Sequence, residues 1–277
     1  MGEVRFTGAV RTLGLMAGKG IYPSTFVAGA RKQAEPVRLV TIGFTGETDP
    51  AFESEVDVME WVRVGQLAKI IKFFKREGVT ELVMVGQVTP KNLFEFRPDL
   101  RVTMAMAKLK ERNAETLFGA LSDEFAKDGI TVLPATTFLD ELLPSAGQVL
   151  GRTLTADELE TARFGYGIAK ETSRMDIGQS VVVREGTVLA VEAFEGTNEC
   201  VRRGGSLGKG KKVVLAKVSK PRQDMRFDVP VIGPDTIRIC AEAGVGAIAI
   251  EAGKTLVLGW EEAEKLAKEL KVGVVAL

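Results

Sequence analysis

The chain has 277 residues, of which 45% are hydrophobic, and it contains no histidine. This length and composition suffice for about two globular domains and exclude wholesale disorder. The absence of histidine excludes Ser-His-Asp and Cys-His catalysis and every metal site built on histidine ligands. The 37 basic and 37 acidic residues cancel, which argues against a dedicated nucleic-acid-binding protein.

The first half alternates between apolar strand patterns and helix patterns. Val64–Glu77 is the clearest helix, because apolar residues recur there every three or four positions and Gly78 follows its basic last turn. Another helix is expected to begin near Pro23. Alternating strands and helices predict an α/β, Rossmann-like domain with a mostly parallel sheet. The expected strands are Leu13–Ala17, Val37–Ile42, Leu82–Val85 and Ile130–Leu133.

A change of composition near Pro144–Gly147 indicates a linker, which predicts domains at 1–146 and 151–277. In the second domain, Thr155 begins a capping-box pattern that predicts a helix. Glu185-Gly186 lies between two apolar runs and predicts a hairpin. Further strands and helices complete a mixed α+β domain. The expected segments are strands at Lys212–Ala216, Ala247–Ile250 and Thr255–Leu258, and helices after Pro234 and Trp260.

The first candidate site is the glycine-rich loop containing Gly18, Lys19 and Gly20, between a strand and a helix. Glycines let the backbone approach a phosphate, and a helix N-terminus favours an anion. The spacing matches neither the dinucleotide fingerprint nor the P-loop, so the alternative is an ordinary tight turn. Gly86 and Gln87 end another predicted parallel strand and should lie at the same sheet edge. A strand-ending glycine is, however, also a common structural feature.

Two carboxylate-bearing segments in the second half are further candidates. Glu192 is expected inside an apolar strand, where burial of an isolated carboxylate is costly, and salt bridging is the more frequent explanation. Asp224 and Asp228 lie in or beside a basic segment between Arg202 and Arg226. Carboxylates beside arginines suit Mg²⁺ or Mn²⁺ together with a phosphate. The alternative for this segment is a solvated charged loop.

These segments occur together and in this order in one known family. From Leu13 to its C-terminus, the chain resembles the LpxI-type UDP-2,3-diacylglucosamine pyrophosphatases of lipid A biosynthesis. The matching segments are LGLMAGKGIYP, VGQLAKIIKFFKREGVTELVMVGQV, RPDLR, RMDIGQSVVVREGTVLAVEAFEGTN, RRGG and KVSKPRQDMRFDVPVIGPDTI. The resemblance implies hydrolysis of the substrate diphosphate to UMP and 2,3-diacylglucosamine 1-phosphate (lipid X). It also implies a nucleotide-side N-terminal domain and a lipid-side, catalytic C-terminal domain.

The resemblance implies site residues as well. The catalytic and metal-binding aspartate corresponds to Asp228, with Mg²⁺ or Mn²⁺ as cofactor. Substrate contacts are implied for Gly18, Gly20, Ile21, Gly86, Gln87, Asp176 and Thr197. A homodimer is also implied. Many relatives have aspartate where this chain has Asn198, and a Gly-Asp-Asp run where it has 112–115.

Two expectations concern location. Cys200 and Cys240 form no CxxC pair, and no segment resembles a secretory signal or a transmembrane helix, which predicts a cytoplasmic protein with reduced thiols. The basic segment could also draw it to the anionic inner leaflet of the inner membrane. The alternatives to a pyrophosphatase are a nicotinamide-dependent oxidoreductase, disfavoured by the glycine spacing, and a non-catalytic nucleotide- or lipid-binding module.

Overall fold

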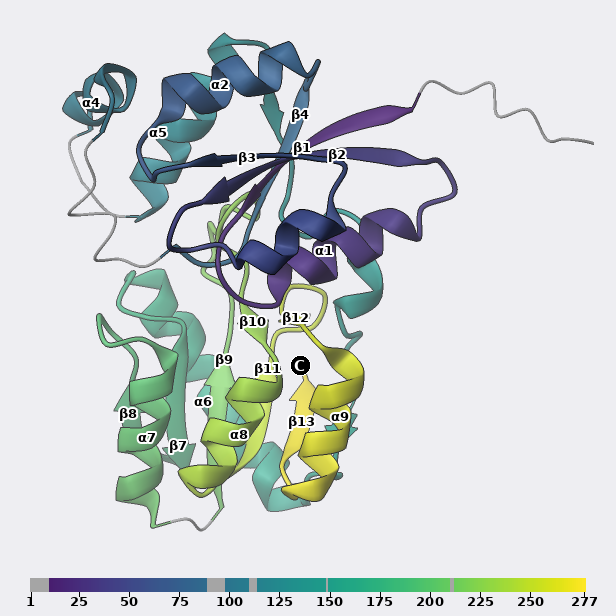
Figure 1. Cartoon of the computed structure of the whole chain (residues 1–277). Coiled ribbons are helices and arrows are strands. Elements are labelled where there is room, and N and C mark those ends of the chain that lie inside the picture. The colour runs from purple at the N-terminus through teal and green to yellow at the C-terminus, as the bar shows by residue number, and fades with distance from the viewer. Residues whose placement is uncertain (1–9, 89–97, 110–113, 148, 210–211) are drawn as a thin grey trace, which may run out of the picture. The chain divides into compact units, whose positions relative to one another are not determined.

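A computed structural model describes residues 10–88, 98–109, 114–147, 149–209 and 212–277. Its contacts divide the chain into two compact units (Figure 1). The first comprises Met1–Leu139 and Asp224–Asp228, and the second comprises Asp140–Gln223 and Val229–Leu277. The short segment Asp224–Asp228 therefore packs with the first unit, although it lies far along the sequence.

The first unit contains the predicted parallel sheet, with strand order β3-β2-β1-β4-β5. Its strands are β1 (Arg11–Ala17), β2 (Val37–Phe44), β3 (Val58–Val62), β4 (Glu81–Val85) and β5 (Thr131–Val132). Its helices are α1 (Tyr22–Arg31), α2 (Leu67–Arg76), α4 (Leu100–Ala107) and α5 (Ala114–Lys127), with a 3-10 turn, η1 (Pro50–Glu55). Sequence periodicity did not indicate β3 or α4.

Helices cover both faces of this sheet, as Figure 1 shows for α1 on one face and for α2 and α5 on the other. Burial of the apolar side of α2, including Ile70 and Phe74, explains the periodicity seen in the sequence. These side chains pack with Ile42 and Met84 from the strands and with Phe125 from α5. The apolar layer on this side of the sheet thus holds the ends of β1 and β4 in place.

The second unit contains a six-stranded mixed sheet with the order β6-β13-β11-β9-β7-β8, which confirms the mixed fold expected here. Its strands are β6 (Val149–Gly151), β7 (Ser180–Arg184), β8 (Thr187–Val191), β9 (Val213–Lys217), β11 (Val245–Ile250) and β13 (Gly273–Ala276). Strands β9, β11 and β13 are parallel, and the other three are antiparallel to their neighbours. A separate parallel pair joins β10 (Val231–Ile232) to β12 (Leu256–Val257).

The helices of this unit lie on both faces of the sheet. One face packs against α6 (Ala156–Arg174), and the other packs against α7 (Thr197–Gly208), α8 (Pro234–Glu242) and α9 (Trp260–Glu269). A 3-10 turn, η2 (Asp140–Leu142), begins the unit. The predicted capping box is present, because Thr155 accepts a hydrogen bond from the Glu158 N–H and Glu158 accepts one from the Thr155 N–H.

Helix α7 was not predicted, because glycines at positions 204, 205 and 208 weaken a helix in isolation. The structure gives the reason for these glycines. A Cβ on Gly204 would lie 2.4 Å from Val182 Cβ, and one on Gly205 would lie 2.1 Å from the Ala243 carbonyl oxygen. The glycines therefore let α7 pack closely against β7 and against the end of α8, and tertiary packing outweighs the low helix propensity.

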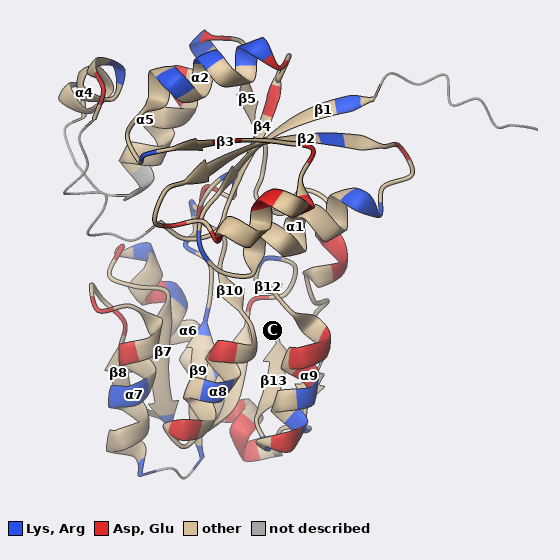
Figure 2. Ribbon diagram, in the orientation of Figure 1, with Lys and Arg blue, Asp and Glu red and all other residues tan. Residues whose placement is uncertain are grey.

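Charged residues of both signs are interspersed, as Figure 2 shows along α7 and α9. The segment predicted to be basic is largely neutralised by acids from other segments. Arg203 pairs with Glu195, for example, and Lys212 pairs with Asp157. Both cysteines are buried without a disulfide, and burial raises the thiol pKa of Cys200 to about 12. No helix among the described residues is long and apolar enough to cross a membrane.

Candidate functional site

In the first unit, the loops after β1 and β4 are joined through their backbones. The Gly18 N–H donates to the Val85 carbonyl at 2.8 Å. Lys19 and Gln87 then exchange two backbone hydrogen bonds, of 2.7 and 3.1 Å. The sequence-predicted residues Gly18, Gly86 and Gln87 therefore lie together at the carboxyl edge of the parallel sheet.

Close contact between these loops requires glycine on both sides. A Cβ on Gly18 would lie 2.5 Å from the Gln87 carbonyl oxygen, and one on Gly86 would lie 2.8 Å from the Lys19 carbonyl oxygen. Gly20 differs, because it adopts φ +88° while a Cβ there would meet no described atom within 4 Å. Gly18 and Gly86 thus serve the contact between the loops, whereas Gly20 serves the turn and leaves open space beside it.

The loop leads directly into helix α1. Ile21 precedes the helix with its side chain 49% exposed, and no side chain caps this N-terminus. Uncapped N–H groups and the helix dipole favour an anion at this position. Lys19 lies in the same loop, and its Nζ is 3.1 Å from an oxygen of buried Glu47. The predicted Gly18, Gly20 and Ile21 therefore form one loop that is suited to an anionic group.

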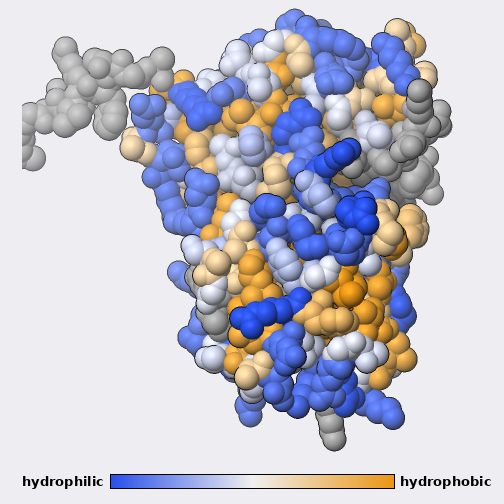
Figure 3. Space-filling model, turned by 180° about the vertical axis from the view of Figure 1, so that it is seen from behind, coloured by the Kyte–Doolittle hydropathy of each residue, from blue (hydrophilic) through white to orange (hydrophobic). Residues whose placement is uncertain are grey.

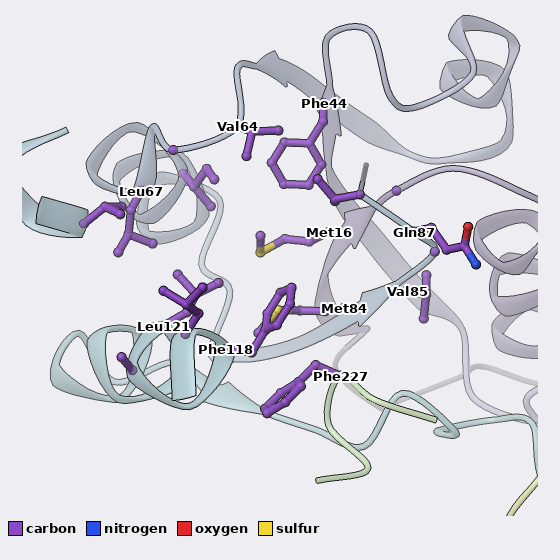
Figure 4. Close-up of a pocket in the computed structure, with 18 of the residues that line it drawn as sticks. Met16, Phe44, Val64, Leu67, Met84, Val85, Gln87, Phe118, Leu121 and Phe227 are labelled. Carbon is purple, nitrogen blue, oxygen red and sulfur yellow. The ribbon is translucent and has the colours of Figure 1, made fainter. Parts of the chain in front are cut away.

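An apolar cavity of about 690 Å³ lies against these loops within the first unit. Figure 4 shows Met16, Met84 and Phe118 in its middle, Leu67 and Leu121 at one end and Gln87 at the other. The lining residues are Met16, Gly18, Lys19, Phe44, Val64, Gly65, Leu67, Ile70, Met84, Val85, Gly86, Gln87, Val88, Val102, Ala105, Met106, Leu117, Phe118, Ala120, Leu121 and Phe227. The sequence analysis missed this cavity, because its walls come from segments far apart in the chain.

The segment that carries Asp228 is anchored to the first unit. The Ala135 N–H donates to the Met225 carbonyl at 2.7 Å, and the Phe227 ring stacks on Phe118 with centroids 5.1 Å apart. The Asp228 N–H closes the turn by donating to the Asp224 carbonyl at 3.0 Å. Asp228 is therefore held one residue from a side chain that lines the cavity.

Asp224 is already engaged with a neighbouring cation. The Arg226 guanidinium donates hydrogen bonds to its carboxylate, from Nε at 2.9 and 3.1 Å and from Nη2 at 2.6 Å. These bonds hold the pKa of Asp224 below its usual range. Of the two aspartates that the sequence analysis considered, Asp224 serves an ion pair within its own turn.

In the second unit, Thr197 is the centre of a polar cluster at a sheet edge. Its hydroxyl donates to Glu192 Oε1 at 2.9 Å, lies 3.2 Å from the Ser180 hydroxyl and accepts from Lys217 Nζ at 3.2 Å. Glu192 Oε2 is buried and has no hydrogen-bond partner among the described residues. The predicted Asp176 forms an ion pair with Lys220 in the same unit. Asn198 is exposed in the first turn of α7.

Glu251 is a buried carboxylate that the sequence analysis did not identify, although an acid directly after an apolar strand was a usable signal. It accepts hydrogen bonds from Ser219 Oγ at 2.7 Å, from Lys254 Nζ at 2.9 Å and from Lys170 Nζ at 3.0 Å. Burial would raise the pKa of Glu251, but these hydrogen bonds together outweigh burial and hold it at about 2. Glu251 thereby fixes the loop after β9, which carries Lys220.

The described residues contain no group of three or more aspartate, glutamate or cysteine side chains placed to hold a metal ion. The donor set thus does not form a complete protein cage. Binding of Mg²⁺ by one or two carboxylates, with substrate phosphates and water as the other ligands, would not need such a group. Positions 112 and 113, where many relatives carry part of a Gly-Asp-Asp run, lie outside the described residues.

The Gly18 contact predicts a difference between glycine substitutions. Gly18→Ala should destabilise the first unit most, because its Cβ overlaps the backbone of the facing loop, at a cost of about 1–3 kcal/mol. Gly20→Ala should cost about 1–2 kcal/mol from its positive φ alone. Gly78→Ala, with φ +75° and open space, is the matched control. Urea unfolding in which Gly18→Ala is the mildest variant would contradict this assignment.

The Glu251 network predicts a pH-dependent contribution to stability. The folded pKa of about 2 lies below the ordinary value of 4.5, so ionised Glu251 stabilises the fold above that value and the benefit disappears as pH falls toward 2. Glu251→Gln should lower the free energy of unfolding by about 1.5–3 kcal/mol at neutral pH. The difference from wild type should shrink in acid, whereas exposed Glu242→Gln should show neither effect. A deficit that does not change with pH would contradict the prediction.

Comparisons with known proteins agree along nearly the whole chain. The LpxI N-terminal domain model matches residues 12–142, and the LpxI C-terminal domain model matches residues 145–275. The UDP-2,3-diacylglucosamine pyrophosphatase LpxI of Caulobacter vibrioides is 31% identical over an alignment of 279 positions that spans 97% of this chain and 98% of that protein.

Similarity to a solved structure is much weaker. The biotin carboxylase domain of Hydrogenobacter thermophilus 2-oxoglutarate carboxylase is 10% identical, with a TM-score of 0.29 over 65% of this chain and 36% of that one. This value is too low to support an argument about fold or function. The two domain models and the full-length relative instead determine the assignment, and the chain belongs to the LpxI family.

Proposed function

We propose that this protein hydrolyses the diphosphate of UDP-2,3-diacylglucosamine to UMP and lipid X in lipid A biosynthesis. The observation that carries the proposal is the 31% identity to a pyrophosphatase of that name across 97% of the chain. Glycine loops and an uncapped helix N-terminus at one sheet edge support it, because they suit a phosphate-bearing ligand. Both the enzyme class and the substrate follow from this relationship.

Diphosphate cleavage needs charge neutralisation and an in-line water more than covalent work by the protein. In our proposal, backbone groups of Gly18, Gly20 and Ile21 and the strand-end residues Gly86 and Gln87 bind the substrate. Asp176 and Thr197, which belong to the second unit, are the further substrate-binding residues that the resemblance implies. Thr197 is suited to this role because Glu192 and Lys217 orient its hydroxyl through hydrogen bonds.

Asp228 is the proposed catalytic residue and the proposed protein ligand for Mg²⁺ or Mn²⁺. A bound divalent cation would supply charge neutralisation at the phosphoryl oxygens and lower the pKa of a bound water. The chain contributes Asp228 at the end of a turn that Met225 and Phe227 anchor to the first unit. That anchoring would keep the carboxylate oriented with little loss of side-chain entropy on binding.

We predict that Asp228→Asn abolishes UMP release while preserving the fold and substrate affinity. The isosteric amide keeps the turn but removes the negative charge that would bind a cation or orient water. Phosphorus NMR of protein, substrate and Mg²⁺, with and without a chelator, measures the reaction. Asp235→Asn, an exposed change in the first turn of α8, is the control. Near-normal turnover by Asp228→Asn would disprove its role, and binding without any UMP release by wild type would indicate a non-catalytic module.

We also propose a cytoplasmic protein that contacts the inner-leaflet surface peripherally and forms a homodimer. A diacylated substrate resides in a bilayer, and the second unit exposes apolar side chains, among them Met175, Ile177 and Phe194. Figure 3 shows hydrophobic residues at the surface on the rear of this unit. Ion pairing of the basic segment leaves little net positive charge for long-range attraction, which favours a weak, apolar contact.

The proposed bilayer contact predicts weak flotation with anionic vesicles. Phe194→Ser should reduce the bound fraction several-fold, because Phe194, at 96% exposure, is the most exposed large apolar residue described in the second unit. Exposed Leu270→Ser, in the same unit, is the control. If wild type did not float with vesicles at low salt, or if Phe194→Ser left the bound fraction unchanged, this role would be refuted.

A further inference from the structure

The residues that line the cavity of the first unit are almost all apolar. Of its 21 described lining residues, only Lys19 and Gln87 carry polar side chains. Interiors of proteins are normally close-packed, and voids larger than a water molecule are few. A volume of about 690 Å³ lies instead in the range of ligand sites. This space is therefore shaped for a ligand, and its chemistry favours a hydrocarbon.

The polarity of the cavity is graded along its length. Both polar side chains belong to the bridged loops after β1 and β4. Figure 4 shows Gln87 at the end opposite Leu67 and Leu121. Such an arrangement matches a molecule with a polar head near the glycine loops and an apolar tail that extends between α2 and α5. A wholly polar ligand would match only one end.

A uracil base fits this lining poorly. Its two carbonyls and its N–H would need hydrogen-bond partners, and leaving such groups unpaired in a buried site costs about 1–3 kcal/mol each. The apolar end offers methionine, leucine, valine and phenylalanine side chains instead. Met16, Met84 and Met106 are also adaptable, since an unbranched thioether side chain can follow a flexible chain.

We propose that this cavity receives an acyl chain of the substrate. The proposal rests on the proposed function and adds a lipid subsite to the unit that was expected to bind only the nucleotide. Phe227 supports it further, because its ring lines the cavity and stacks on Phe118, while the next residue is Asp228. A ligand in the cavity would thus contact the same short turn that positions the proposed catalytic carboxylate.

The test fills the cavity from α5. Ala120 lines it, whereas Ala126 on the same helix is exposed, so Ala120→Trp and Ala126→Trp form a matched pair. Each is assayed with a myristoyl-bearing substrate and with its short butyryl analogue. Ala120→Trp should lower kcat/KM for the long-chain substrate by roughly 10- to 100-fold, since each methylene left in water costs about fourfold. Activity on the short analogue should stay within about threefold of wild type, and Ala126→Trp should match wild type on both substrates.

Additional measurements separate the possible outcomes. Substrate and UMP affinities, measured in the Asp228→Asn background, do not depend on turnover. Loss of long-chain affinity with unchanged UMP affinity supports the proposal, even if wild type proves unable to hydrolyse the substrate and the proposed function fails. If the affinities for the long-chain and short-chain substrates fell equally and UMP binding was also lost, the cavity would bind the nucleotide. That result would overturn the proposal. Ala105→Phe, on α4, repeats the test should Ala120→Trp not fold. Unchanged long-chain preference in the folded variants would also overturn it.

Discussion

The direct contact between two backbone loops is the constraint on which the first unit's site depends. With Gly18 and Gly86 facing each other, the ends of β1 and β4 approach closely enough for Lys19 and Gln87 to pair. The paired loops lie directly before helix α1 and at the border of the cavity. The fold therefore requires the two glycines independently of any ligand. A ligand that contacts these loops would bind a backbone arrangement that is already formed.

Strong local patterns allowed much of the fold to be predicted from sequence. The α2 periodicity, the capping box at Thr155 and the turn at Glu185-Gly186 each express a local physical preference, and each appears in the structure. Helix α7 escaped prediction because its glycines are selected by close packing against Val182 and Ala243, which are distant in sequence. Local propensity carries no information about such neighbours.

The candidate site divides in the same way. The glycine loops were predictable because parallel strands end at a common edge, and Gly18 and Gly86 do meet there. The apolar cavity was not, because Met16, Phe118 and Phe227 become neighbours only after folding. Likewise, the Glu251 network depends on Lys170 and Ser219, which lie 81 and 32 residues away along the chain.

The excursion of Asp224–Asp228 has a consequence for how the protein can be divided. Its first unit is discontinuous in sequence, because this five-residue segment, in the C-terminal third of the chain, completes it. A fragment cut at the linker near residue 146 would lack the Met225 backbone partner of Ala135 and the ring that stacks on Phe118. Recombining halves from two homologues at that linker would pair one parent's cavity wall with the other parent's aspartate turn. Such a chimaera would therefore contain a first unit assembled from both parents, although its sequence halves each come from one parent.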